Sequence, residues 1–209
     1  MNKRGLLIVV SGPSGTGKGT VCHALLQKRP DIHLSVSATT RKPRPGEADG
    51  VNYYFLSEEK FKSMIEEKGF IEWACFCQNY YGTPRDKVEE QLAAGHDVIL
   101  EIEVQGEMQV RSKFPEAVFV FVMAPSVEEL ERRLSGRGTE APAVIKERLK
   151  TALWEYSNME KYNYILLNDE VDGAVDRLIS IIDAEKQRTE RNADVIQEAL
   201  KAKERIDLQ

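Results

Sequence analysis

The sequence predicts an α/β fold in which a parallel β-sheet is covered by helices. Its short apolar runs are continuous rather than alternating, as strands buried on both faces require. Segments of helical periodicity lie between them, and this alternation is typical of a parallel sheet. The runs are Leu6–Val10, Val98–Ile102, Val118–Met123 and Tyr164–Leu167. With 209 residues, the chain suits one such core with small insertions better than two large domains.

Helices are predicted around each of these strands. Ser126 and Glu129 have the spacing of a capping box, which indicates a helix that begins at Ser126. The last helical segment places its apolar residues on one face, as a helix packed on a sheet requires. In chain order the helical segments are Val21–Gln27, Pro84–Ala94, Gln105–Lys113, Ser126–Leu134 and Val171–Ile182.

Two segments interrupt the alternation and define the expected domain organisation. Residues 37–83 combine short β-like pieces with a helical stretch, Ser57–Glu67, so we expect an inserted subdomain there. Residues 126–155 are expected to form a lid region, because residues 135–150 hold glycines and four cations that suit a mobile basic flap. The core then comprises residues 1–36, 84–125 and 156–183, and residues 184–209 form a charged helical tail.

Composition and charge exclude several classes of protein. A content of 42% hydrophobic and 30% charged residues is that of a folded globular chain. The net charge of −5 argues against general affinity for nucleic acid, and no apolar stretch approaches the roughly 18 residues of a membrane span. Three cysteines, an odd number, favour reduced thiols. We expect a cytoplasmic protein that binds neither nucleic acid nor membrane.

Cys75 and Cys77 could be taken for a metal site because they have Cys-x-Cys spacing. No second Cys or His pair flanks them in the sequence, as a zinc site would require. They also lie in an apolar, strand-like run. We therefore interpret both as structural thiols.

A glycine-rich loop follows the first predicted strand directly and precedes the first predicted helix. This strand-loop-helix context gives the pattern G-x-x-x-x-G-K its meaning. Glycines let successive backbone N–H groups point at an anion, the helix N-terminus adds its positive end, and Lys18 can reach the β- and γ-phosphates. The alternative is a plain turn with a solvent-facing lysine. The residues predicted to bind a nucleoside triphosphate are Gly12, Pro13, Ser14, Gly15, Thr16, Gly17, Lys18, Gly19 and Thr20.

One position departs from the usual phosphate loop. Lys18 is followed by Gly19 rather than by the Ser or Thr whose hydroxyl commonly binds Mg²⁺. Metal contact through Thr20, through a carboxylate or through intervening waters therefore stays open. We expect Mg²⁺ to accompany the triphosphate, with Thr20 as the candidate ligand.

Further motifs follow this loop along the chain. They are Ser37–Glu47 (SATTRKPRPGE), Phe70–Ala74 (FIEWA), Asn79–Thr83 (NYYGT), Ile99–Gly106 (ILEIEVQG), Arg133, Arg137–Thr139 and Asn168–Asp169. Over about residues 5–183 the chain closely resembles guanylate kinase, a family of nucleoside monophosphate kinases. The resemblance implies a P-loop NTPase core with a GMP-binding insert and a lid. It also implies the reaction ATP + GMP = ADP + GDP with Mg²⁺.

The resemblance also implies which residues bind GMP. Arg41 and Arg44 can form charge-assisted bonds to the acceptor phosphate, completed by the hydroxyls of Tyr53 and Tyr81. Glu72 is the expected base reader, because one carboxylate can accept both the N1–H and the 2-amino N–H of guanine. Adenine offers neither, and a site of this kind discriminates by factors on the order of 10⁴ or more.

The remaining GMP-binding residues surround that carboxylate or follow the strand Val98–Ile102. Ser37 and Thr83 are the expected hydroxyl partners at the guanine O6 side. Glu101 and Glu103 lie at the end of that strand, where open parallel sheets place ligands. Asp is more usual in the family at the position of Glu103, so its contact, to nucleotide or to Mg²⁺ through water, stays open.

The resemblance assigns catalysis to cations on both sides of the transferred group. Outside the phosphate loop, Arg133, Arg137 and Asn168 are expected to bind ATP. Lid closure would bring Arg133, Arg137 and Arg148 onto the phosphates and exclude water before the chemical step. The predicted catalytic residues are Lys18, Arg41, Arg137 and Arg148.

Alternatives remain at this point. A non-catalytic guanylate-kinase-like interaction module is disfavoured because Lys18, Arg41, Arg44 and Arg137 all persist. A nucleotide switch or ATPase would leave the cluster of acceptor-binding residues unexplained, and a kinase for another monophosphate is disfavoured by Glu72. The charged tail is interpreted as a solvated helical extension, with a homo-oligomer contact as the alternative.

Overall fold

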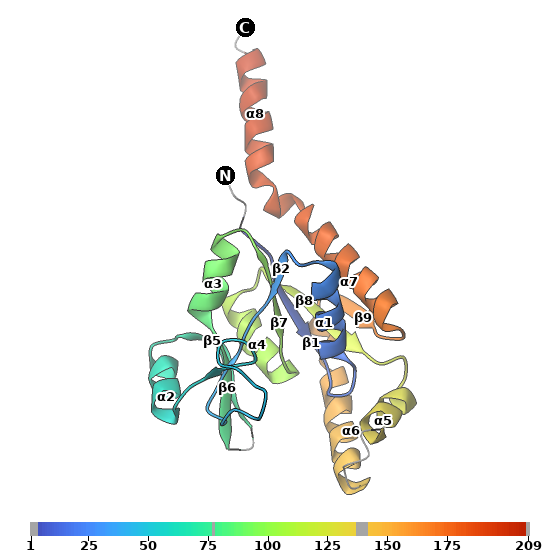
Figure 1. Ribbon diagram of the computed structural model, residues 1–209. Helices are drawn as coiled ribbons and strands as arrows, with labels where there is room; N and C mark the ends of the chain where they lie inside the picture. Colours follow the sequence, from blue (N-terminus) through green and yellow to red (C-terminus); the bar gives the residue numbers. More distant parts are fainter. Residues whose placement is uncertain (1–3, 77, 137–141, 208–209) are drawn as a thin grey trace.

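The computed structural model describes residues 4–76, 78–136 and 142–207. Its core is a five-stranded sheet with helices on both faces (Figure 1). The strand order is β2-β7-β1-β8-β9 and every pairing is parallel, which confirms the predicted α/β core. The strands are β1 (Leu7–Ser11), β2 (Ile32–Leu34), β7 (Asp97–Glu101), β8 (Val118–Met123) and β9 (Tyr164–Leu167).

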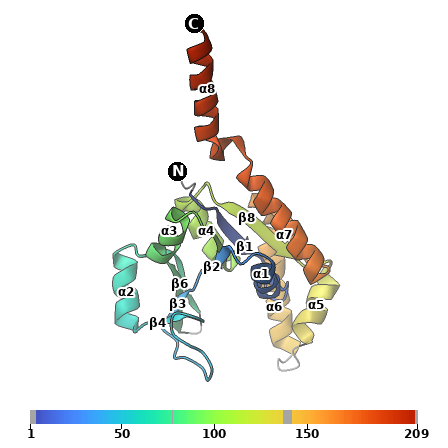
Figure 2. The ribbon, with the colours of Figure 1, turned by 45° about the horizontal axis from the view of Figure 1, so that its top comes forward.

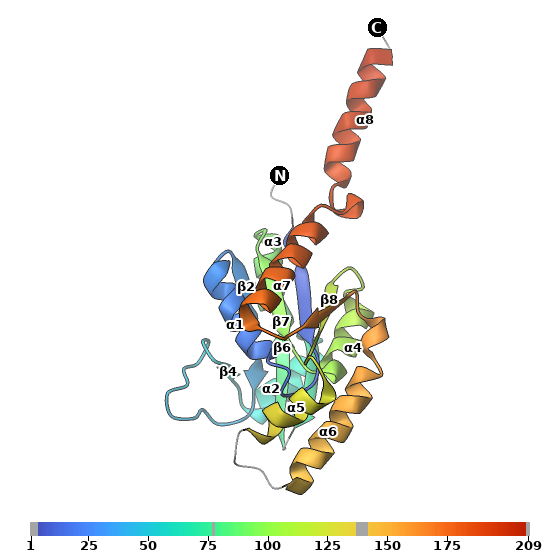
Figure 3. The same cartoon turned by 90° about the vertical axis from the view of Figure 1, so that its right-hand side faces the viewer.

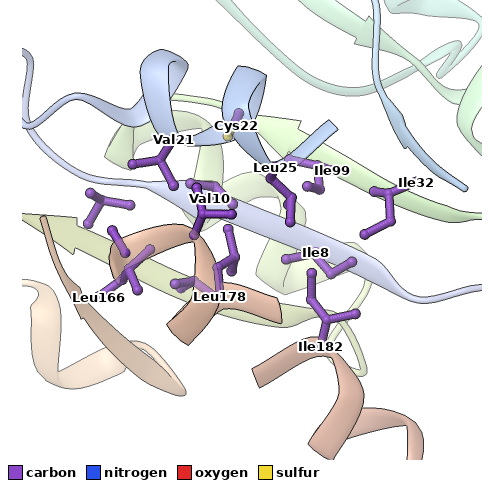
Figure 4. Close-up of a cluster of buried hydrophobic side chains, with 14 of the residues drawn as sticks. Ile8, Val10, Val21, Cys22, Leu25, Ile32, Ile99, Leu166, Leu178 and Ile182 are labelled. Atoms are coloured by element: carbon purple, nitrogen blue, oxygen red, sulfur yellow. The ribbon is translucent and has the colours of Figure 1, made fainter. Parts of the chain in front are cut away.

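Two apolar cores form on the two faces of this sheet, because successive residues of a strand point to opposite sides. Ile8 and Val10 face the helices α1 (Lys18–Lys28) and α7 (Val171–Lys186), as Figure 4 shows. Leu7 and Val9 face α3 (Arg85–Ala93) and α4 (Val104–Lys113) on the other side. Burial on both faces explains why the strand is apolar without alternation.

A second, mixed sheet is formed within the segment expected to be an insertion. Its strand order is β4-β3-β6-β5, and α2 (Glu58–Glu66) packs on it through Phe61, whose ring stacks on Phe70 with centroids 4.3 Å apart. Ser57 caps this helix by accepting a hydrogen bond from the Lys60 N–H. The strands are β3 (Ala38–Thr39), β4 (Tyr54–Phe55), β5 (Phe70–Phe76) and β6 (Asn79–Pro84).

Two helices lie across from this sheet, at the same end of the core (Figures 1 and 2). The first, α5 (Val127–Ser135), begins as the capping pattern predicted, with the Glu129 N–H 3.1 Å from Ser126 Oγ. The second, α6 (Pro142–Tyr156), was not predicted. Its apolar side chains pack against α5 and the end of β8, so the helix belongs partly to the core.

The tail follows α7 and contains one short helical turn and one longer helix. A 3-10 turn (Thr189–Arg191) separates α7 from α8 (Ala193–Asp207). Figures 1 and 3 show α8 extending away from the body of the molecule. A further 3-10 turn (Met159–Lys161) precedes β9. Throughout the described ranges, no helix combines the length and apolarity that crossing a membrane requires.

Candidate functional site

The phosphate loop joins β1 to α1 in the conformation that an anion site needs. Gly15 and Gly17 have φ of 88° and 86°, a left-handed backbone that favours glycine. Gly17 is also the N-cap of α1, so the free N–H groups of the first helical turn point toward the loop. Lys18 is 7% exposed, and its Nζ donates to the carbonyls of Gly12 and Pro13 at 2.5 and 3.2 Å. The loop is therefore already closed around its lysine.

The loop lines a cavity of about 530 Å³ at the carboxyl edge of the core sheet. Glu101 ends β7 and Asn168 follows β9, so both reach this edge, where parallel sheets bind ligands. Eleven of the predicted site residues line it: Pro13, Ser14, Gly15, Gly17, Lys18, Gly19, Thr20, Glu101, Glu103, Arg133 and Asn168. A larger hollow of about 930 Å³ lies at the opposite edge, around the ion pair of Asp97 and Lys186, and contains none of them.

Arg133 and Asn168 tie α5 and β9 to the phosphate loop. Asn168 is buried, and its Nδ2 donates to the carbonyl of Thr16 at 2.7 Å. Arg133 donates to the carbonyls of Asn168 and Thr16, at 3.0 and 3.4 Å, while Glu129 holds its Nε at 2.7 Å. From α6, Arg148 donates to Ser14 Oγ at 2.6 Å. Arg137 lies outside the described residues.

Three carboxylates gather near Lys18. Glu103 Oε1 lies 3.8 Å from Lys18 Nζ. Burial raises the pKa of Glu101, and Glu103 adds to this while Lys18 opposes it. Burial, with a smaller contribution from Glu103, also raises the pKa of Glu155 on α6 to about 7 against the effect of Lys18. The sequence did not single out Glu155, because its approach to the loop depends on the packing of a helix that was not predicted.

Gly19 leaves room beside Glu101. A Cβ added at Gly19 would lie 3.1 Å from Glu101 Oε1, so this carboxylate stands where a serine side chain would extend. Thr20 is exposed and lines the same cavity. Carboxylate and hydroxyl oxygens are ligands that suit Mg²⁺, so the donor set fits this ion. Within the described ranges, no three His, Cys, Asp or Glu side chains are grouped to hold a metal on their own.

On the insert, Arg41 is held by a partner that the sequence did not identify as functional. Glu47 binds the guanidinium of Arg41 through both oxygens, at 2.9 and 3.0 Å, and accepts from the Arg44 N–H at 2.7 Å. Arg41, followed by the Arg44 N–H, lowers the pKa of Glu47. The guanidinium lies 5.4 Å from the ring centroid of Tyr53, and the Tyr53 and Tyr81 rings meet edge to face at 6.1 Å. The structure thus brings together Arg41, Tyr53 and Tyr81, three of the four side chains expected around the acceptor phosphate, and ties the backbone of Arg44 to them through Glu47.

Glu72 and Thr83 form a buried pair between β5 and β6. Glu72 is 7% exposed and Thr83 is fully buried. Thr83 Oγ1 donates a hydrogen bond to Glu72 Oε1 at 2.7 Å. Burial raises the pKa of Glu72, while the hydrogen bond from Thr83 and the charge of Lys113 lower it. Ser37 directly precedes β3, and its carbonyl accepts from the Tyr54 N–H. The hydrogen bond from Thr83 fixes Glu72 Oε1, while Oε2 lies on the side of the carboxylate that borders Gly106 of α4.

Two of the three cysteines lie within the described residues. Cys22 is buried and Cys75 is exposed, and both are free thiols. Cys77 lies outside the described residues. Burial raises the pKa of the Cys22 thiol far above its usual range, which keeps it neutral.

Comparisons with known proteins point in one direction. The guanylate kinase family model matches residues 4–185. The guanylate kinase of Caldanaerobacter subterraneus is 54% identical over 195 residues, which cover 93% of this chain and 95% of that protein. The guanylate kinase of Desulfitobacterium hafniense is 55% identical over 193 residues, or 92% and 96% of the two chains. The crystal structure of guanylate kinase from Anaplasma phagocytophilum superposes with a TM-score of 0.72 at 34% identity, covering 91% of this chain and 90% of that one.

Proposed function

The chain belongs to the guanylate kinase family, and from this premise we propose which of its residues bind the two nucleotides and transfer the phosphoryl group. The reaction is ATP-dependent phosphorylation of GMP, and the chain is a nucleoside monophosphate kinase. The observation that carries the assignment of the acceptor is the buried Glu72 carboxylate, which Thr83 fixes by a hydrogen bond to Oε1 and which we propose meets the base.

On the donor side, the loop amides and Lys18 would hold the phosphates of ATP. A buried lysine that donates to two loop carbonyls needs little reorganisation to exchange one of them for a phosphate oxygen. Arg133 and Asn168 would contribute by fixing the Thr16 carbonyl and thereby the shape of the loop. Arg137 and Arg148 are proposed to meet the transferred phosphoryl group from the lid.

Thr20, Glu101 and Glu103 are the residues that would hold Mg²⁺, directly or through water. Their oxygens line the cavity that contains Lys18. When bound, the ion neutralises charge on the donor phosphates. The protein's own part is to place acceptor oxygens beside Gly19, where the loop itself has no hydroxyl.

On the acceptor side, Arg41 and Arg44 are proposed to bind the phosphate of GMP, together with the Tyr53 and Tyr81 hydroxyls. Glu47 would fix the plane of the Arg41 guanidinium, so that its free N–H groups point at the phosphate rather than at solvent. For the base, Glu72 would accept from the N1–H and 2-amino group of guanine, and Ser37 and Thr83 would serve the O6 side.

Transfer then requires both sites to come together without water. The insert and the α5–α6 pair stand on opposite sides of the phosphate loop, so their approach would align donor and acceptor in line. The bond between Arg148 and Ser14 joins the lid to the loop in this arrangement. Closure before chemistry would keep water from taking the phosphoryl group.

The test is ADP formation from Mg·ATP with GMP, AMP, CMP, UMP or no acceptor. Turnover confined to GMP supports the proposal. A folded protein without turnover would contradict it and favour the interaction module, whereas ADP release without acceptor would favour an ATPase.

We also propose a cytoplasmic location and a homo-oligomer contact through α8. This helix projects from the body and exposes Val195, Ile196 and Leu200, at 55%, 39% and 56%. Apolar side chains on a projecting helix favour pairing with a second copy. Sedimentation of wild type and Leu200→Glu tests the contact: a dimer that becomes monomeric supports it, and a wild-type monomer at high concentration contradicts it.

A further inference from the structure

Gly106 stands in the first turn of α4, where glycine carries a cost. It is the third helical residue after the N-cap Glu103. Glycine is intrinsically less favourable within a helix than alanine. Its backbone is not in the left-handed region, so the conformation itself does not call for glycine. Another feature of the fold must explain the missing side chain.

That feature is the carboxylate of Glu72. A Cβ added at Gly106 would lie 2.9 Å from Glu72 Oε2 and 3.4 Å from its Cδ, closer than a carbon normally approaches an unbonded oxygen. Glu72 cannot retreat at no cost, because its other oxygen accepts the hydrogen bond from Thr83 at 2.7 Å. Both residues are buried. A methyl group on Gly106 would therefore displace the carboxylate.

Gly173 offers an internal comparison at the same helical position. It is the third residue after the N-cap Glu170 of α7. A Cβ there would meet only the guanidinium of Arg177, no closer than 3.4 Å. At that distance the Cβ makes an ordinary van der Waals contact, so Arg177, which pairs with Asp169, need not move. The two glycines thus share a helix position and differ in what borders them.

We propose that Gly106 is a specificity-determining position, whose missing side chain sets where the Glu72 carboxylate lies and so how it meets the base of the acceptor. The inference rests on the proposed role of Glu72. Gly106 acts as a positioning residue through that carboxylate. Its substitution should alter acceptor binding while leaving donor binding and the fold intact.

The experiment compares Gly106→Ala with Gly173→Ala and wild type, measuring KM for GMP, KM for ATP and thermal unfolding. Gly106→Ala is expected to raise KM for GMP at least tenfold, with KM for ATP within twofold of wild type, in a protein that still unfolds cooperatively. Gly173→Ala is expected to change neither KM. A Gly106→Ala protein with wild-type KM for GMP, in a chain that phosphorylates GMP, overturns the inference alone. A wild type inactive toward GMP overturns the proposed function itself.

A double-mutant cycle with Glu72→Ala separates this effect from general damage. If Gly106 acts through the carboxylate, Gly106→Ala adds less than twofold to KM for GMP once that carboxylate is gone. An undiminished increase in the Glu72→Ala background overturns the inference. Should Gly106→Ala alone unfold, restored folding in the double variant supports the same clash, and continued unfolding there contradicts it.

Discussion

The donor and acceptor halves of the site are built in different ways. The phosphate loop consists of nine consecutive residues, Gly12 to Thr20, and the groups that we propose bind ATP there are backbone amides and Lys18. The proposed acceptor half draws side chains from β5, β6 and the loop between β3 and β4. Local sequence therefore specifies the donor half, whereas the acceptor half exists only once the second sheet has formed.

Because of this difference, we expect substitutions in the two halves to have different effects. Backbone groups cannot be removed by substitution, so the donor half depends heavily on its lysine. The acceptor half distributes its contacts over paired side chains, each held by a partner. Substitutions there should affect GMP alone and by smaller factors.

The largest effect is expected at Lys18. Lys18→Ala removes the one charged group that the loop directs at the phosphates, so kcat should fall roughly 10²- to 10³-fold. Lys28→Ala, at the exposed end of the same helix, is the matched control and should retain activity. Steady-state ADP formation measures both. Equal activity in the two variants would remove Lys18 from the mechanism.

Arg41 should matter less, and only for the acceptor. Loss of a hydrogen bond to a charged group costs about 1.5–3 kcal/mol, so Arg41→Met should raise KM for GMP roughly ten- to hundredfold with KM for ATP unchanged. The neighbouring Lys42 is exposed, and Lys42→Met should behave as wild type. A parallel rise in KM for ATP would show that the two halves are not separable as described.

Glu155 links the stability of the donor half to pH. Its pKa of about 7 lies above the ordinary 4.5, so between these values the folded state binds more protons than the unfolded state. Stability should therefore fall as pH rises through this window. Glu155→Gln lacks this titration. Between pH 4.5 and pH 8 the free energy of unfolding of wild type should therefore fall by about 1–2 kcal/mol relative to that of Glu155→Gln, allowing for solvent screening. Urea unfolding of both proteins at several pH values measures this. The same pH dependence of the free energy of unfolding in wild type and Glu155→Gln would refute the prediction.

The smallest effect is expected at Glu47. Its ion pair with Arg41 is partly exposed, and such pairs contribute about 0–1 kcal/mol, so Glu47→Gln should raise KM for GMP up to about fivefold. Glu58→Gln breaks the exposed pair with Lys62 on α2 and serves as control. A Glu47 effect larger than that of Arg41→Met would mean that Glu47 itself binds substrate.

The same contrast explains what the sequence could predict. Continuous apolarity predicted β1 at Leu6–Val10, observed at Leu7–Ser11, and periodicity predicted α4 within one residue. The strand β2 was missed because it has three residues, of which only Ile32 is buried. The helix α6 was missed although its core-facing residues Ile145, Leu149, Ala152 and Tyr156 recur at helical spacing, because the glycines and cations of residues 135–150 indicated a mobile flap instead.

Within the site, the residues missing from the sequence-based prediction are those whose roles depend on contacts that form only on folding. Glu47 has no motif of its own, and its role follows from the way the loop folds back on Arg41. The pKa of Glu155 is raised by its burial and, to a smaller extent, by Glu103, which lies far from it in the chain. Gly106 has significance only because Glu72, on another element, borders it. The acceptor roles of Arg41 and Glu72 themselves came from the family resemblance rather than from local pattern.

The most direct test of the account is the ratio of kcat/KM for GMP to that for IMP, which keeps the N1–H of guanine and lacks its 2-amino group. If Glu72 reads the base, the wild-type ratio should be well above tenfold, because IMP leaves one oxygen of the buried Glu72 unpaired. In Glu72→Ala the ratio should approach one. A ratio near one in wild type, or a large ratio that survives removal of the carboxylate, would contradict the account.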